Sequence, residues 1–281
     1  MLQHTFCHIP GIGLKREERI WSQGIFTWSD FLKTDRWPDA DDSLLSSISY
    51  SHVRSHVMTS VEKYNASDIL FFYSALPSSE RWRLYRFPGS KEGYLDIETT
   101  GLGKDSSITT IALYSDGIIK HYVEGINLNE FEKDISSCNL LVTYNGRAFD
   151  LPFLSRQLLI EFNQAHIDLR FVLAEMGYKG GLKGCEKSLG IDRGDLYGLD
   201  GYDAVLLWKE YIRTKNSSFL DTLIAYNIAD TINLETLLIL AYNMKAEKNN
   251  YFKTPFLSMP VQPEVHFQPD QSAVEQIHRM R

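Results

Sequence analysis

Two acidic residues, Asp96 and Glu98, lie two positions apart in the apolar stretch "GYLDIETTGLG", residues 93–103. Successive side chains of a strand point to opposite faces, so these two carboxylates share one face and Leu95 and Ile97 share the other. Unpaired charges are costly in a buried strand. The pattern therefore predicts either an edge strand with one solvated face or a strand whose carboxylates bind a metal ion.

A second acidic position follows an apolar strand in "LVTYNGRAFDLPFL", residues 141–154. The chain is predicted to turn at Gly146 and then to enter a helix, with Pro152 in its first turn. Asn145 and Asp150 bracket this strand-to-helix corner. Asp150 is either a simple N-cap, a common role for Asp before a helix, or part of the same site as Asp96 and Glu98.

A third acidic position lies in "AYNIADTINL", residues 225–234, within a long apolar helix. Tyr226 and Asp230 are four residues apart and therefore share one helix face. An Asp inside so apolar a helix requires a partner. The alternative is a core tyrosine beside an exposed aspartate.

Taken together, Asp96, Glu98, Asp150 and Asp230 supply four carboxylates from a strand, a corner and a helix. Crowded negative charges repel one another, and two divalent cations would balance these four. Hard oxygen ligands suit Mg²⁺ or Mn²⁺, so the sequence predicts a site for two ions of either kind. A two-metal site serves in-line phosphoryl displacement, in which Tyr226 would orient the attacking water by its hydroxyl.

The 281 residues are 43% hydrophobic, which allows one large domain or one domain with an appendage. No apolar run approaches about 18 residues and no signal peptide is evident, so nothing indicates a membrane or export. Cys7, Cys138 and Cys185 have no paired spacing, which favours reduced thiols in a cytoplasmic protein. The net charge of −7 argues mildly against a nucleic-acid binder but does not exclude a local basic groove.

The composition and periodicity along the chain predict three regions. Residues 1–66 form a helical segment, residues 67–245 a mixed α/β sheet covered by helices, and residues 246–281 an aperiodic tail. Within the second region, "RWRLYRF" (81–87) alternates like a strand, and Asp116-Gly117 predicts a hairpin between two strands.

The motifs "LDIETTGL", "YNGRAFDLPFL" and "YNIADTINL", in this order and at these separations, resemble those of the DEDD superfamily of 3′ to 5′ exonucleases, which has the ribonuclease-H-like fold. The spacing of Tyr226 and Asp230 is similar to that of the tyrosine subclass. The closer resemblance is to the YprB-type ribonuclease-H-like domain family, because "HIDLR", "CEKSLGI" and "YDAVLLWKEY" stand between the second and third motifs. The resemblance covers about residues 67–245.

The resemblance implies that Asp96, Glu98, Asp150 and Asp230 bind metal and that Tyr226 positions water. It also implies contact with the terminal nucleotide by the residues just past Glu98, which are Thr99, Thr100, Gly101 and Leu102, and a site shaped by Asn145. The activity implied is metal-dependent trimming of DNA or RNA from the 3′ end. Asp168 and His166, in "HIDLR", are secondary candidates for which a structural role at a strand end is favoured.

Two activities compete with the exonuclease. Ribonuclease-H-like folds also host structure-specific endonucleases, and fold does not fix function. The other alternative is a domain that binds nucleic acid without cleaving it. Intact acids at all four positions count against this last reading, since a silent binder would be free to lose one.

Other segments are weaker candidates for nucleic-acid contact. "HIPGIGLKREERI" (8–20) places Gly11 and Gly13 before a basic helix, where backbone N–H groups could face a phosphate, and it resembles half of a helix-hairpin-helix element. An ordinary turn explains the same glycines. "RWRLYRF" could line a groove with Arg81, Arg83 and Tyr85, although a soluble edge strand is favoured. The lysines of "KGGLKGCEK" (179–187) could also contact phosphate, from a loop rather than a helix.

Overall fold

A computed structural model describes residues 1–39 and 41–281, and these divide into two units. The first unit comprises Met1–Ser90 and Leu240–Ser258, and the second Lys91–Ile239 and Met259–Arg281. The first division therefore falls after Ser90 rather than after residue 66. Residues 67–90, assigned by the sequence to the sheet region, pack instead with the N-terminal helices.

A mixed sheet forms the centre of the second unit. Its strands, as far as the described residues show, are β1 (Glu92–Thr99), β2 (Ile108–Ser115), β3 (Ile118–Val123), β4 (Leu140–Thr143) and β5 (Ala165–Asp168), in the order β3-β2-β1-β4-β5. Strand β1 pairs antiparallel with β2 and parallel with β4. The predicted hairpin is confirmed: β2 and β3 are joined by Asp116 and Gly117, which both have positive φ, as a tight hairpin turn requires.

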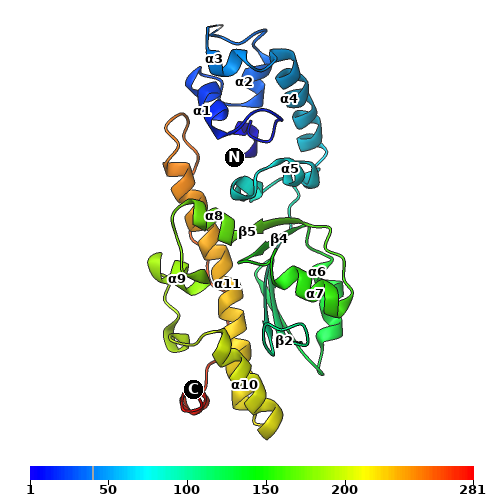
Figure 1. Ribbon diagram of the computed structural model, residues 1–281, viewed down its shortest axis with the longest axis vertical. Coiled ribbons are helices and arrows are strands. Elements are labelled where there is room, and N and C mark those ends of the chain that lie inside the picture. The colour runs from blue at the N-terminus through cyan, green and yellow to red at the C-terminus, as the bar shows by residue number, and fades with distance from the viewer. Residues whose placement is uncertain (40) are drawn as a thin grey trace. The chain divides into compact units, whose positions relative to one another are not determined.

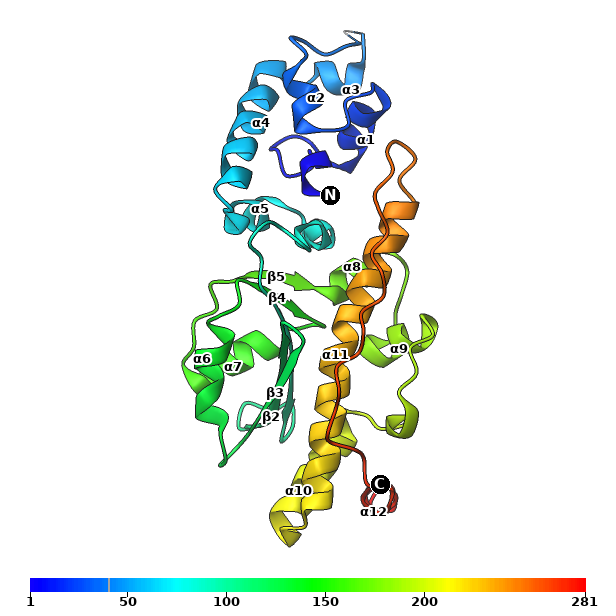
Figure 2. The same ribbon diagram turned by 180° about the vertical axis from the view of Figure 1, so that it is seen from behind.

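The helices of this unit cover the sheet. They are η3 (Leu128–Glu130), α6 (Phe131–Ile135), α7 (Asp150–Leu158), α8 (Leu169–Glu175), α9 (Gly181–Ser188), η4 (Gly194–Leu196), α10 (Gly201–Thr214), α11 (Ser217–Glu247) and α12 (Gln271–His278). Figures 1 and 2 show α6 and α7 beside one face of the sheet and α11 beside the other. The predicted mixed α/β sheet flanked by helices is confirmed.

The two faces of β1 have different neighbours. Leu95 and Ile97 belong to an apolar core that also contains residues of α6 and α7, such as Phe131 and Phe153. Asp96 and Glu98 point to the opposite face, the one that α11 covers. The predicted alternation is confirmed, and it turns both carboxylates toward α11.

Helix α11 is long and apolar enough to cross a membrane by length and composition alone, but 78% of its most apolar window is buried inside the structure. Its residues up to Ile239 pack in the second unit, and the rest belongs to the first. Burial against several elements accounts for an apolar composition that continues around the whole helix.

The first unit is helical, as the sequence predicts for residues 1–66. Its elements are η1 (Leu2–His4), α1 (Leu14–Ser22), α2 (Trp28–Leu32), α3 (Ser43–Ser46), α4 (Tyr50–Asn65), α5 (Ile69–Ala75) and η2 (Ser78–Leu84). Aromatic rings dominate its core: Trp28 stacks on Phe72 with ring centroids 5.6 Å apart, and Phe31 stacks on Tyr50 at 5.0 Å. The Trp28 and Phe72 stack attaches α5 to the N-terminal helices.

The strand predicted for "RWRLYRF" is wrong, because most of it lies in the 3₁₀ helix η2. Arg83 is buried there between the carboxylates of Glu17 and Glu80, at 2.8 and 2.7 Å. Tyr85 is buried as well. These contacts override the alternating pattern, and they leave Arg83 and Tyr85 unable to line an open groove.

Two other predictions need correction. "KGGLKGCEK" is helical from Gly181 to Ser188 in α9, where the sequence favoured a loop. The helix forms despite its glycines because buried Cys185 and Glu186 anchor it. The predicted aperiodic tail contains α12, whose Ala273, Val274 and Ile277 pack into the core of the second unit.

Replacing Arg83 tests the buried ion pairs of the first unit. Arg83→Met would leave Glu17 buried without its cation and Glu80 with Lys245 alone, so the free energy of unfolding should fall by about 3 to 5 kcal/mol. Lys33→Met is the control, because Lys33 pairs with Asp30 on the surface, and its loss should cost about 0 to 1 kcal/mol. Urea unfolding measures both, and equal losses would contradict the prediction.

Candidate metal and nucleic-acid site

Three acidic side chains meet between β1 and α11. One carboxylate oxygen each from Asp96, Glu98 and Asp230 lies within 4.8 Å of the other two. The alternation of β1 places the first two on one face, and α11 brings Asp230 against that face. Side chains far apart in the sequence therefore come together between β1 and α11.

Asp150 lies near these three acids without joining their group. It is the first residue of α7, and its carboxylate is buried and accepts the backbone N–H of Ile97 on β1. Burial raises the pKa of Asp150 to about 7, although this hydrogen bond and one from its own N–H lower it. The structure thus places the fourth predicted acid at the same strand but outside the three-carboxylate group.

The carboxylates act on one another electrostatically. Burial raises the pKa of Asp96 well above its usual range, and the charges of Asp230, Asp150 and Glu98 raise it further, against a lowering hydrogen bond from Asn227. Burial and Asp230 also raise the pKa of Glu98. Bound protons or nearby positive charges are therefore needed to offset the repulsion among these carboxylates.

Two cations reach the acidic group from α9 and the segment after it. The Arg193 guanidinium pairs with Asp230 Oδ1, and Lys183 Nζ lies 3.9 Å from Asp230 Oδ2. Both cations lower the pKa of Glu98. The sequence predicts Lys183 only as a phosphate contact, and no pattern indicates Arg193, which lies in a segment without periodicity.

Tyr226 is buried beside Asp230 on α11, as the predicted four-residue spacing requires. Its hydroxyl accepts a hydrogen bond from Lys183, whose ammonium group also lies 4.2 Å from the centre of the Tyr226 ring. Lys183 therefore connects the tyrosine to the carboxylates.

Asn227 is a further site residue that the sequence analysis missed. Its Nδ2 donates to Asp96 Oδ2 at 2.7 Å. Its own Oδ1 is buried and has no hydrogen-bond partner among the described residues. The three-residue separation from Asp230 was the available signal, because it places both side chains on one helix face.

These donors fit a hard divalent ion. Carboxylate oxygens are the ligands that Mg²⁺ and Mn²⁺ prefer, and Asp96, Glu98 and Asp230 supply three of them close together. The unpaired Asn227 Oδ1 adds a neutral oxygen next to this group. The site therefore has the composition that the predicted metal requires.

The loop after β1 is held in shape by its threonines. Thr99 Oγ1 donates to the Gly101 carbonyl at 2.7 Å, and Thr100 exchanges two hydrogen bonds with Ser107. Gly101 has a φ of 156°. Leu102 is 87% exposed. An apolar side chain thus projects from a well-defined loop, where the sequence predicts contact with the terminal nucleotide.

Asn145 occupies the corner after β4 in a left-handed conformation, with a φ of 66°. Its N–H donates to Asp168 Oδ1 at 2.8 Å, and Asp168 Oδ2 accepts the Arg147 N–H at 3.1 Å. Asp168 also caps α8 through the Arg170 N–H. The structural role favoured for Asp168 is confirmed, and this residue fixes the corner that carries Asn145.

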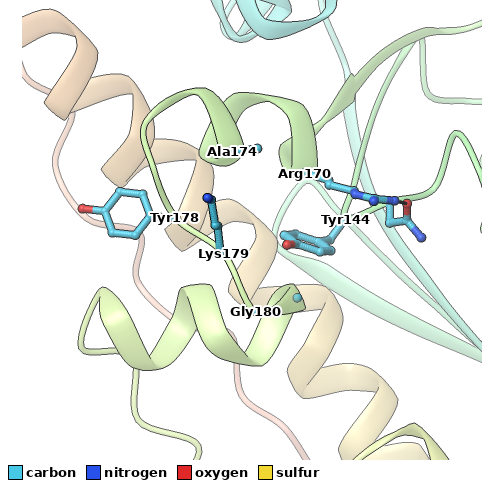
Figure 3. Close-up of a pocket in the computed structure, with 8 residues that line it drawn as sticks. Tyr144, Arg170, Ala174, Tyr178, Lys179 and Gly180 are labelled. Carbon is cyan, nitrogen blue, oxygen red and sulfur yellow. Dashed lines mark hydrogen bonds between the residues drawn. The ribbon is translucent and has the colours of Figure 1, made fainter.

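A pocket of about 510 Å³ opens beside Asn145. Its lining combines aromatic and cationic side chains: Tyr144, Arg170, Tyr178 and Lys179, with Ala174, Gly180 and Gly181. In Figure 3, Arg170 and Tyr144 lie on one side and Tyr178 on the other, between α8 and α9. Helix α9 connects this pocket to the acidic group, because it carries Gly181 at the pocket and Lys183 at Asp230.

Gly11 and Gly13 belong to the first unit. Gly11 has a φ of 87°, and a Cβ there would meet Ile48 at 2.8 Å, so the turn itself requires glycine. Arg16, in the first turn of α1, donates to the Gly11 carbonyl. The turn explains Gly11, and nucleic-acid contact at these glycines stays a prediction.

Comparison with known proteins gives two similarities. The family model RNase_H_2, described as RNase_H superfamily, matches residues 93–242. A solved family B DNA polymerase from the hyperthermophilic archaeon Pyrobaculum calidifontis is similar over 57% of this chain, with 16% identity and a TM-score of 0.43, and the match covers 25% of that polymerase. No curated protein matches the chain at a significant level.

The raised pKa of Asp150 predicts how stability depends on pH when metal is removed. Between about pH 4 and about pH 7 the folded protein keeps a proton that the unfolded chain loses, so the free energy of unfolding should fall as pH rises through this range. Urea unfolding in EDTA measures it. Asp150→Asn should flatten the dependence, whereas exposed Asp105→Asn should not. A free energy that rises with pH would contradict the prediction.

Proposed function

Since the chain belongs to the ribonuclease H superfamily, we propose that it is a divalent-metal-dependent nuclease that removes nucleotides from the 3′ end of DNA or RNA. The observation that supports this most directly is the convergence of Asp96, Glu98 and Asp230 within 4.8 Å on one face of the sheet. The order of the three acidic motifs supports the DEDD type, and "HIDLR", "CEKSLGI" and "YDAVLLWKEY" support the YprB-type family.

Asp96, Glu98 and Asp230 would hold Mg²⁺ or Mn²⁺, with Asp150 beside them. A bound divalent ion would activate water and stabilise charge on the phosphate in phosphodiester hydrolysis. The predicted pair of ions stays a prediction, supported by the three carboxylates that converge here.

The remaining residues would bind and orient the reactants. The Tyr226 hydroxyl, which Lys183 holds by a hydrogen bond, would position the attacking water. Exposed Leu102 and the loop of Thr99, Thr100 and Gly101 would contact the terminal nucleotide, which supports attack at an end rather than within a strand. Three free, buried cysteines accord with the cytoplasmic location that we also propose.

The pocket beside Asn145 supplies a path for the rest of the nucleic acid. Arg170 and Lys179 are exposed cations suited to phosphates, and Tyr144 and Tyr178 offer ring faces on which bases stack. These side chains provide the local basic surface that a net charge of −7 leaves possible.

Cleavage of 5′-labelled oligonucleotides tests the proposal. DNA and RNA, single- and double-stranded, are incubated with Mg²⁺, Mn²⁺ or EDTA. With Mg²⁺ or Mn²⁺ we expect a ladder of products shortened from the 3′ end. In EDTA we expect no cleavage. Asp96→Asn should slow it about 10³-fold, because several kcal/mol of charge stabilisation is lost, whereas exposed Asp105→Asn should not. One internal cut would indicate an endonuclease, and binding without cleavage a silent domain.

Replacing Tyr226 tests its part in the reaction. Tyr226→Phe keeps the buried ring and removes only the hydroxyl, so kcat should fall about 10²-fold with little change in KM. Tyr211→Phe, on α10, is the matched control and should retain full activity. If KM rises while kcat stays unchanged, Tyr226 instead contributes to substrate binding.

A further inference from the structure

Arg193 is fixed by residues outside the three-carboxylate group. Its Nη1 donates to Glu186 Oε2 at 2.7 Å, and Glu186 Oε1 in turn accepts Asn233 Nδ2 at 2.8 Å. The side chains of Arg193 and Glu186 are only 6% and 1% exposed. A guanidinium buried this deeply is costly to move away from its partners, so Arg193 is a built-in cation of the site.

This cation occupies one side of Asp230. Arg193 Nη2 pairs with Asp230 Oδ1, which leaves Oδ2 facing Lys183 at 3.9 Å. Asn227 Nδ2 similarly occupies Asp96 Oδ2. Protein donors therefore already hold one oxygen of each of these carboxylates.

Two bound ions would need carboxylate oxygens that these protein donors already engage. Ions in a two-metal site lie about 3.5 to 4 Å apart and clamp a shared phosphate from both sides. A carboxylate that bridges them uses both of its oxygens. Asp96 Oδ2 and Asp230 Oδ1 are each engaged by a protein donor. Asp150 lies outside the group in which Asp96, Glu98 and Asp230 each offer one oxygen. Such a triad suits one ion.

We propose that the site binds a single divalent ion and that Arg193, anchored by Glu186, takes the place of a second cation at Asp230. The inference rests on the proposed nuclease function, because it concerns the ion that this function requires. Arg193 is then a positioning residue: it orients Asp230 and supplies positive charge that other sites obtain from metal.

Titration of the purified full chain with Mn²⁺ tests the number of ions without measuring cleavage. Calorimetry should give one ion per chain, and the electron paramagnetic resonance spectrum should be that of an isolated Mn²⁺. Two ions per chain with a spectrum of a magnetically coupled pair would overturn the inference and leave the nuclease intact. A wild-type chain that binds no Mn²⁺ would overturn the metal site and the proposed function together.

Variants of Arg193 then test its role. Arg193→Met should bind a second Mn²⁺ and show the coupled spectrum, whereas Arg193→Lys, which keeps the charge, should still bind one. Arg213→Met is the matched control, because Arg213 pairs with Glu210 on α10, and it should also bind one. If Arg193→Met binds one ion as well, Arg193 does not replace a cation. Should Arg193→Met fail to fold, a changed ion count in Arg193→Lys would overturn the inference.

Discussion

Repulsion among closely spaced, partly buried carboxylates is the main constraint on the second unit. Asp96, Glu98 and Asp230 lie close together, Asp150 adds its charge nearby, and burial raises the pKa of Asp96, Glu98 and Asp150. An uncompensated group of this kind would oppose folding. The surrounding structure opposes that cost with a guanidinium, an ammonium group and an amide that all contact the acids directly.

The topology explains why compensation comes from α9 and α11. Strand β1 pairs with β2 on one side and β4 on the other, so only elements above or below the sheet can reach the face that carries Asp96 and Glu98. Helix α11 covers it and carries Asp230 together with Tyr226 and Asn227 on successive turns. Helix α9 and the segment after it then bring Lys183 and Arg193 to the same helix face. Asp96, Asp150 and Asp230 thus each accept a donor from another part of the chain.

Local periodicity predicted the parts of this arrangement that depend on neighbouring residues. Two-residue alternation assigned the faces of β1, the Asp116-Gly117 turn predicted a hairpin, and a four-residue spacing put Tyr226 beside Asp230. Tertiary contacts decided the rest. Arg83 left the predicted strand for a buried pair with Glu17, and nothing near Arg193 in the sequence indicates that it meets Asp230. A periodic pattern reports on residues close together in the sequence and does not indicate partners that are distant in it.

The internal cations also bear on the order of folding and metal binding. In small metal-binding domains whose ligands repel one another, the ion supplies much of the folding free energy and the protein unfolds without it. Here Arg193 and Lys183 already offset part of the repulsion, and the sheet and α11 are held by an extensive apolar core. The acidic group can therefore form before the ion arrives, and the ion binds to ligands that the fold has already positioned.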